Sequence, residues 1–322
     1  MTKKWSSRLT FFAFVVLMVG LGSNDSLRGI FSTIFQEHFS LTTTQLGLIV
    51  TASYIGNLVF LLVGGNLSTR FSKKRVLQVL ILIWMAALAL FAFTSNYTVL
   101  LIGMALALGS STLLNTTMNL ITPLLFATAP GFFVNFLFFT QEIGTSGSQY
   151  ILGSHADGFA FWQHTNLVLL ILGAVAFVLL LFCNVPEEAA APADAPAQKG
   201  GYDWRIIVPY VLVFGFYFIA EHGVMNWMVA YGVDGLGLPQ ASAAKYLSVF
   251  FGGMMIGRLC LSPLVDKLGA LKSLAAFGGV SCVLYLIGSL GGAVTMPVWA
   301  ISGLSFSILY PTLVMSIRLY FP

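Results

Sequence analysis

Two carboxylates interrupt long apolar stretches of the chain, where an ionised side chain is costly. Asp25 follows the run FFAFVVLMVGLG and stands three residues before Arg28, and Glu221 lies within FIAEHGVMNWMVAY. An ionised carboxylate at the centre of a membrane helix costs roughly 2.5–3.5 kcal/mol on insertion scales. Asp25 and Arg28 share one helix face, so two interpretations stay open. In the first, the two residues form an ion pair that makes both charges tolerable within the helix. In the second, Asp25 faces water and takes up a proton.

Two further segments carry polar stripes that are typical of a helix face. The stripe in 98–126 is made of Thr112, Asn115, Asn119 and Thr122, and the stripe in 132–153 of Asn135, Glu142, Ser146 and Gln149. Such groups either hydrogen-bond neighbouring helices, at about 0.6 kcal/mol each on average, or line a hydrated lumen. Together with a buried carboxylate, the two polar stripes favour the second interpretation, a hydrated lumen. Gly144 and Gly147 are expected to let helices approach closely.

The segment 205–233 combines aromatic and polar side chains. Tyr217 and Glu221 are four residues apart, and Trp227 and Tyr231 repeat that spacing. Aromatic faces beside amides and carboxylates suit sugars, whereas Trp and Tyr also form belts at the membrane surface. We predict that Asp25 takes up a proton, with Glu142 and Glu221 as second choices. The predicted substrate-binding residues are Asn24, Arg28, Asn115, Asn119, Gln149, Asn226 and Trp227.

Composition restricts the class of protein. Charged residues are 8% and hydrophobic residues 58% of the 322, whereas soluble domains carry roughly 25% charged residues. The sequence therefore predicts an all-α, polytopic membrane protein. The basic residues cluster beside apolar segments, which argues against nucleic-acid binding. A Walker loop, a nucleophile motif, a metal-ligand pair and paired cysteines are all lacking, so we expect neither an enzyme nor a cofactor.

Ten apolar spans can be delimited by hydropathy. They are 9–35, 43–66, 76–94, 98–126, 132–153, 165–184, 205–233, 241–263, 272–290 and 295–320. The Pro/Ala/Gly-rich stretch 186–204 is typical of a linker, and it divides a six-helix lobe (1–185) from four helices of an incomplete lobe (205–322). Of the fifteen Lys and Arg residues, all but Arg28 and Lys245 fall on one side when the spans alternate. The positive-inside rule then places the N-terminus and the linker in the cytoplasm.

An internal repeat relates the two lobes. With a shift of 197 residues, 41–75 lies over 238–272 without a gap, so that Gly56 meets Gly253 and Arg75 meets Lys272. Related halves of this kind are common in secondary transporters.

The loops GNLSTRFSKKR and SPLVDKLGALK resemble the loop between helices 2 and 3, and its copy between helices 8 and 9, in the major facilitator superfamily. Their candidate residues are Arg70, Lys73, Arg75, Asp266 and Lys267. The resemblance implies that these groups bind the ends of neighbouring helices in one of the protein's conformers. Thr69 and Ser72 stand where that pattern has Asp and Gly.

Further stretches are similar to the fucose/galactose/glucose–proton symporter branch of this superfamily. They are Asn24-Asp25, FQEHFSLTTTQ, NTTMN, FIAEHGVMNWMVAY, MMIGR and GLSFSILYPT. The resemblance implies twelve helices, of which about ten are present here, and a proton role for Asp25. Asn115 replaces a Glu of that branch that is implicated in proton coupling, and Glu142 is a hypothetical substitute.

Together these features predict a monomeric secondary transporter in the inner (plasma) membrane that takes up a hexose-like sugar with a proton by alternating access. Two alternatives stay open: a major facilitator transporter of a drug or an organic acid, and a truncated, non-transporting remnant. An anionic cargo would need a cation within a span, and Arg28 is the expected candidate.

Overall fold

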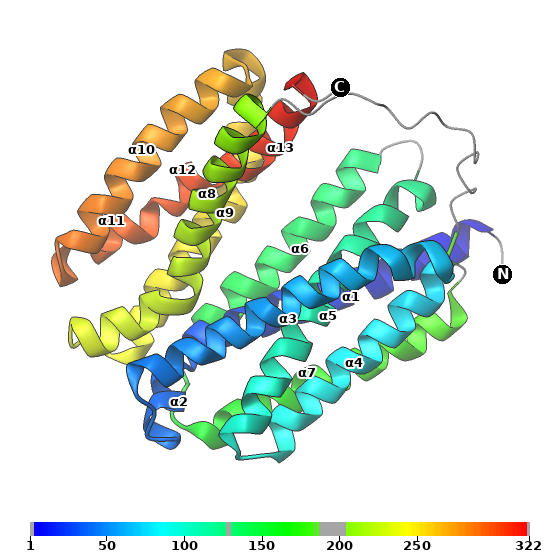
Figure 1. Ribbon diagram of the computed structural model, residues 1–322, viewed down its shortest axis with the longest axis horizontal. Helices are drawn as coiled ribbons and strands as arrows, with labels where there is room; N and C mark the ends of the chain where they lie inside the picture. The colour runs from blue at the N-terminus through cyan, green and yellow to red at the C-terminus, as the bar shows by residue number, and fades with distance from the viewer. Residues whose placement is uncertain (1–2, 127–129, 184, 187–203, 321–322) are drawn as a thin grey trace. The chain divides into compact units, whose positions relative to one another are not determined.

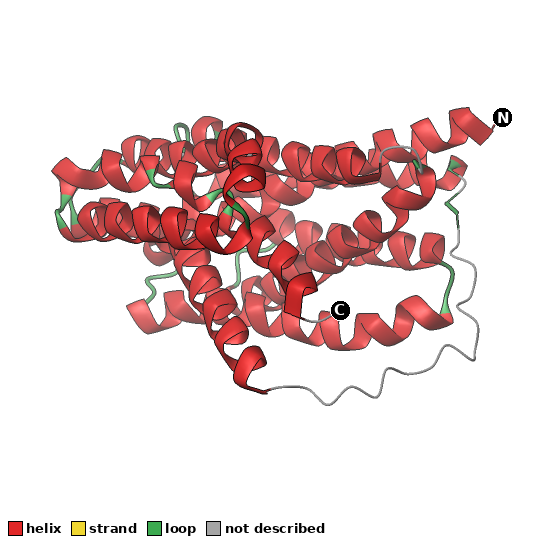
Figure 2. Ribbon diagram, turned by 90° about the horizontal axis from the view of Figure 1, so that it is seen from above, coloured by secondary structure: helices red, strands yellow, loops and turns green. Residues whose placement is uncertain are grey.

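The computed structural model describes residues 3–126, 130–183, 185–186 and 204–320, and among them it contains helices and loops but no strand (Figures 1 and 2). The chain divides into two compact units, residues 1–188 and 189–322. Each unit is described by itself. The predicted linker, 186–204, coincides with residues 187–203, which lie outside the described part.

The described residues of the first unit form seven helices. They are α1 (Lys3–Ile30), α2 (Ser32–His38), α3 (Thr43–Arg70), α4 (Lys73–Phe93), α5 (Tyr97–Leu125), α6 (Pro130–Ile151) and α7 (Phe159–Phe182). In this unit α1 packs against α6 and α7, whereas α3 and α4 both pack against α5 (Figure 1). Side-chain caps start three of the helices: Thr42 and Gln45 bond reciprocally before α3, Ser72 caps α4 and Asn96 caps α5. Such caps satisfy amide groups that a helix start leaves without an internal partner.

The second unit contains α8 (Trp204–Ala230), which continues into a π-helical turn at Tyr231–Gly235, and then α9 (Gln240–Leu268) and α10 (Ala270–Leu290). A 3-10 turn at Ala293–Thr295 leads to α11 (Met296–Ile301), α12 (Gly303–Phe306) and α13 (Leu309–Tyr320). The last predicted span, 295–320, is therefore broken into three short helices.

Serine hydroxyls bond local carbonyls at the breaks in this last span. The hydroxyl of Ser302 donates to the carbonyl of Trp299 at 2.6 Å, and that of Ser305 donates to the carbonyl of Ser302 at 2.9 Å. Hydroxyls that bond nearby carbonyls compete with the regular helix ladder and bend it. Hydropathy does not detect this competition, which is why the sequence predicted one continuous helix.

Nine helical segments among the described residues are long and apolar enough to cross a membrane. They correspond to nine of the ten predicted spans. The remaining prediction, 132–153, coincides with α6, a helix of 22 residues that is not among the nine. The all-helical membrane class that composition predicted is thus what the structure shows.

The two units repeat one packing pattern. The bounds of α9 and α10 begin 197 residues after those of α3 and α4. In the first unit, a Cβ on Gly56 of α3 would strike the backbone of Ala105 in α5. In the second, a Cβ on Gly253 of α9 would come within 3.1 Å of the backbone nitrogen of Leu304 in α12. Within each unit, the equivalent pair of helices therefore meets at an equivalent glycine.

Glycine also brings α1 and α6 together. A Cβ on Gly22 would strike the carbonyl of Gln141, and a Cβ on Gly144 would strike the carbonyl of Val19. The close approach predicted at Gly144 is confirmed. The one predicted at Gly147 is wrong, because a Cβ there would meet nothing within 4 Å.

Candidate functional site

The Asp25 carboxylate lies between α1 and α5 in the first unit. The hydroxyl of Ser111 donates to both carboxylate oxygens, at 3.3 and 3.2 Å. Arg28, one helical turn further along α1, attracts the same carboxylate electrostatically. Sequence reasoning paired Asp25 with Arg28 but missed Ser111, although Ser111 precedes Asn115 by four residues and so continues the polar stripe of α5.

Arg28 is almost completely buried, with 5% of its surface exposed. Its guanidinium carbon lies 5.9 Å from the centre of the Tyr54 ring of α3, within the range of a cation–π interaction. Tyr54 was not predicted. The Asp25–Arg28 pair is therefore held by groups from three helices, with a hydroxyl on one side and an aromatic ring on the other.

Asn24, the neighbour of Asp25, serves the packing of the unit. Its side-chain oxygen accepts a hydrogen bond of 3.1 Å from the indole of Trp84 in α4, and both side chains are buried. This bond occupies the oxygen that a substrate hydroxyl would use. The structure thus gives Asn24 an interhelical partner, and its predicted contact with substrate is untested.

A chain of amides links α5 to α6. The Asn119 side chain donates to the oxygen of Asn115 at 2.6 Å, and the Asn115 side chain donates to the oxygen of Gln141 at 2.6 Å. Asn115 and Asn119, predicted from their spacing, are therefore brought together. Gln141 was missed because it lies off the helical face that Glu142 and Gln149 define.

Two predicted residues of α6 differ in their surroundings. Glu142 is half-buried and follows Gln141 directly. Gln149 is fully buried, and neither of its side-chain polar atoms has a hydrogen-bond partner among the described residues. A buried amide without partners is unfavourable by about 1–3 kcal/mol. Gln149 is therefore the position of this helix that most needs a water or ligand group.

A second charged cluster lies inside the second unit. Glu221 of α8 interacts with Arg258 of α9 and with Tyr217, and Tyr310 of α13 interacts with both Glu221 and Arg258. We expected Arg28 to be the cation within a span. Arg28 does lie within an apolar segment, and the structure adds a second cation, because Arg258 falls near the end of the apolar segment Gln240–Leu261 and interacts with a carboxylate. Hydropathy alone had placed Arg258 near the end of its helix.

The remaining predicted residues of α8 lie one turn further along. The Asn226 side chain donates to the carbonyl of His222 at 2.7 Å and is 2% exposed, whereas Trp227 is half-buried. Aromatic side chains dominate around Glu221: the ring of Tyr217 lies 6.0 Å from those of Phe306 and Tyr310.

The predicted conformational loop is described only in part. The side chains of Arg70 and Asp266 lie outside the described residues. Lys73 is half-buried at the start of α4, and Arg75 and Lys267 are exposed. Lys74, which was not predicted, donates to the carbonyls of Leu181 at 3.0 Å and Cys183 at 2.7 Å. Lys74 of this loop thus contacts the end of α7, and the role predicted for the other five residues stays a prediction.

The Major Facilitator Superfamily model matches residues 10–322. The chain belongs to this superfamily. Its members are transporters and not enzymes, as the sequence predicted. Within the described residues, no group of three or more His, Cys, Asp or Glu side chains could hold a metal ion.

Comparisons with individual proteins point to carriers of small molecules. The chain is 24% identical to the L-fucose-proton symporter of Escherichia coli over 333 residues, which cover 90% of this chain and 75% of that protein. It is 27% identical to a glucose/galactose transporter of Brucella abortus over 301 residues, covering 85% and 71%. It is 24% identical to the cis,cis-muconate transport protein of Acinetobacter baylyi over 297 residues, covering 85% and 70%.

Solved structures share the fold. The outward conformation of the transporter FucP matches with a TM-score of 0.66 at 20% identity, covering 96% of this chain and 84% of that one. A D-xylose-proton symporter matches with a TM-score of 0.69 at 16% identity, covering 98% and 83%. The sugar-transporter branch that the motifs suggested agrees with these relatives.

Proposed function

We propose that this protein takes up a hexose-like sugar together with a proton by alternating access. The observation that carries the proposal is the Asp25 carboxylate inside α1, held by Arg28 and by the Ser111 hydroxyl. The amide chain of α5 and α6 begins one turn beyond Ser111. A titratable group thus lies beside hydrogen-bonding groups of the kind that sugar hydroxyls need.

Protonation of Asp25 supplies the coupling step. A neutral carboxyl no longer attracts the Arg28 guanidinium, and it no longer bears the desolvation cost of a buried charge. Protonation therefore changes which conformer is favoured. One proton that crosses 100 mV releases about 2.3 kcal/mol, which at 1.4 kcal/mol per decade supports roughly 40-fold accumulation of a neutral cargo.

Sugar as the cargo rests on two kinds of support. The relatives include carriers named for fucose and for glucose/galactose. The side chains of the first unit offer neutral amide and hydroxyl groups, and those of the second unit offer aromatic faces around Glu221. Sugars present hydroxyls at their edges and C–H groups on their faces, so both kinds of group have a use.

The test is sugar uptake in inside-negative vesicles, followed together with alkalinisation of the outside medium. We expect Asp25→Asn to abolish accumulation while sugar exchange between equal concentrations persists, because exchange needs no net proton transfer. Glu37→Gln removes an exposed carboxylate and is the matched control, expected to accumulate sugar normally. If Asp25→Asn still accumulates sugar, Asp25 is not the coupling residue, and Glu142→Gln and Glu221→Gln then identify which alternative is.

An organic acid is the second candidate cargo. Two arginines, Arg28 and Arg258, lie within apolar spans, and each interacts with a carboxylate. Protonation of either carboxylate would release a cation for an anionic cargo. Relatives include a cis,cis-muconate transport protein and the hexuronate transporter of Bacillus subtilis. A thermal shift with hexuronate but not with hexose would favour this candidate. Transport of neither would favour the non-transporting alternative.

We further propose that the N-terminus and the segment between the units face the cytoplasm, because the basic loops follow the positive-inside pattern. Single cysteines placed at Ser72 and at Ser95, at opposite ends of α4, would test this placement by labelling with a membrane-impermeant thiol reagent. Only the cysteine at Ser95 is expected to react from outside. The reverse pattern would refute the orientation.

A further inference from the structure

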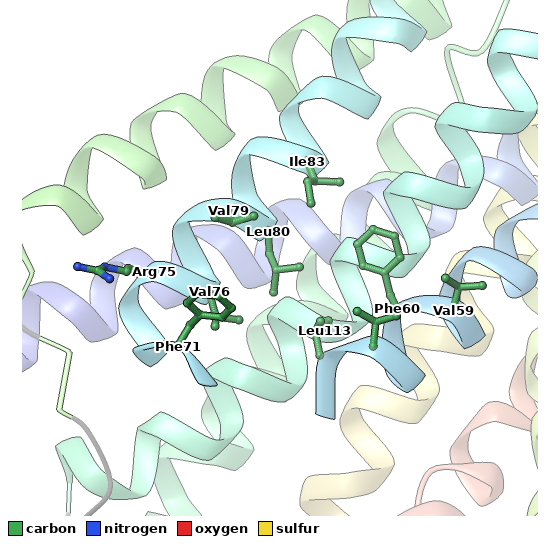
Figure 3. Close-up of a pocket in the computed structure, with 10 residues that line it drawn as sticks. Val59, Phe60, Phe71, Arg75, Val76, Val79, Leu80, Ile83 and Leu113 are labelled. Carbon is green, nitrogen blue, oxygen red and sulfur yellow. The ribbon is translucent and has the colours of Figure 1, made fainter. Parts of the chain in front are cut away.

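An apolar groove with a volume of about 570 Å³ opens on the first unit between α3 and α4. Figure 3 shows its residues in a row, with Val59 near one end and Arg75 at the other. Val59 and Val63 of α3 face Val79 and Ile83 of α4 across the groove, and Leu113 contributes from α5.

The packing of glycines explains why the groove exists. α3 lies close against α5, where a Cβ on Gly64 would come within 2.5 Å of Leu113, and a Cβ on Gly109 within 2.5 Å of Phe60. α4 also packs on α5 but makes few contacts with α3. Helix α5 holds both helices that border the groove. As a result, α3 and α4 diverge after the short connection that joins them.

The groove faces outward from the first unit and not into its core. Val59 and Val63 are each 50% exposed, and Val79 is 54% exposed. These residues belong to helices whose composition fits a membrane span. In a bilayer, such an apolar surface meets acyl chains. An elongated apolar group would therefore fit the groove.

Arg75 is the charged residue among the ten that line the groove. Its backbone nitrogen is bonded to Ser72, but no described residue hydrogen-bonds or ion-pairs with its guanidinium. The neighbouring Lys74, in contrast, is engaged by the carbonyls at the end of α7. A free guanidinium at the end of an apolar groove complements an amphiphile with an anionic head group.

We propose that the groove between α3 and α4 binds one acyl chain of an anionic phospholipid, whose phosphate is held by Arg75. Lipid tails are as apolar as the groove, so the hydrophobic effect contributes little, and retention comes from fit and from charge. A basic residue near an anionic head group contributes about 1 kcal/mol, which corresponds to a roughly fivefold change in affinity. By the proposed orientation, the head group lies in the cytoplasmic leaflet.

Native mass spectrometry of the full chain in detergent tests the charge contact. Phosphatidylglycerol and phosphatidylcholine with identical acyl chains serve as probes. Arg75→Gln is expected to weaken phosphatidylglycerol binding about fivefold and phosphatidylcholine binding less, because the choline ammonium beside the phosphate already offsets its charge. Lys272→Gln is the matched control, because Lys272 is exposed and occupies the equivalent position of the internal repeat. Equal loss in both variants would show nonspecific attraction to positive charge and would overturn the proposal.

A second pair of variants tests the groove itself. Val79→Trp fills the space between α3 and α4, and we expect it to reduce the number of tightly bound phosphatidylglycerol molecules by one. Val168→Trp adds the same bulk at a 63%-exposed position of α7 and should reduce nothing. Size-exclusion profiles confirm that all variants fold. Unchanged lipid binding in Val79→Trp would refute the groove as the site, whatever the effect of Arg75→Gln.

Discussion

The two units place a cation beside an intramembrane carboxylate in different ways. In the first unit, Asp25 and its cation Arg28 belong to the same helix, one turn apart. In the second unit, Glu221 of α8 interacts with Arg258, which α9 supplies. A pair within one helix survives any movement between helices, whereas a pair across two helices depends on their packing. We therefore expect that movement between helices leaves Arg28 within one turn of Asp25, whereas it can separate Glu221 from Arg258.

The surroundings of the two pairs differ as well. Ser111 and the amide chain of Asn119, Asn115 and Gln141 surround Asp25 with hydrogen-bonding groups. Aromatic rings from Tyr217 and Tyr310 surround Glu221. The two units therefore resemble each other more in their helix packing than in the chemistry of their side chains.

The largest contrast is expected when the cations are removed. Arg28→Met leaves the Asp25 charge without its partner, which costs about 3 kcal/mol when the pair is buried. Arg258→Met should cost less, because Arg258 is half-buried whereas Arg28 is 5% exposed, although both carboxylates are half-buried. Thermal unfolding in detergent measures both. The double variant Asp25→Asn/Arg28→Met should recover most of the loss. Equal losses in the two single variants would contradict the distinction between the pairs.

Equivalent glycines give the next contrast. Gly56→Ala places a methyl group against the backbone of Ala105, and overpacking of this kind costs about 1–3 kcal/mol. Gly253→Ala brings its methyl group to 3.1 Å from the Leu304 nitrogen, and the gain in helix propensity of about 1 kcal/mol offsets most of that crowding. Gly56→Ala should therefore lower the melting temperature by several degrees, and Gly253→Ala hardly at all. A larger loss at Gly253 would show that the second unit is the more tightly packed.

The smallest contrast separates two glutamines of α6. Gln141→Leu removes the acceptor for Asn115 and should lower stability by about 1 kcal/mol. Gln149→Leu removes a buried amide that has no partner among the described residues, so stability should stay the same or rise. Melting temperatures with and without sugar test both. If Gln149→Leu lowers stability and also abolishes the shift caused by sugar, Gln149 contacts the cargo.

Hydropathy and spacing predicted most of the fold, because membrane spans are selected for length and apolarity. α3, α4, α9 and α10 lie where the spans and the repeat placed them. The break at Ser302 could not be predicted, since it depends on serine hydroxyls that prefer local carbonyls over the helix ladder. One-dimensional patterns do not distinguish these serines from others in the same span.

Within the candidate site, the sequence predicted only the contacts between residues of the same helix. Spacing found Asp25 with Arg28, and Asn115 with Asn119, because both pairs are local. Partners on other helices, such as Ser111 for Asp25 and Arg258 for Glu221, depend on how helices rotate against one another. That rotation is fixed by close approaches such as the one at Gly22, which a sequence signals only as a small residue.

Lys74 has a mechanical consequence. Its ammonium group donates hydrogen bonds to the carbonyls of Leu181 and Cys183, where the helix dipole of α7 provides partial negative charge. Lys74 therefore ties the last turn of α7 to the first turn of α4, so that fraying of the end of α7 requires these two hydrogen bonds to break.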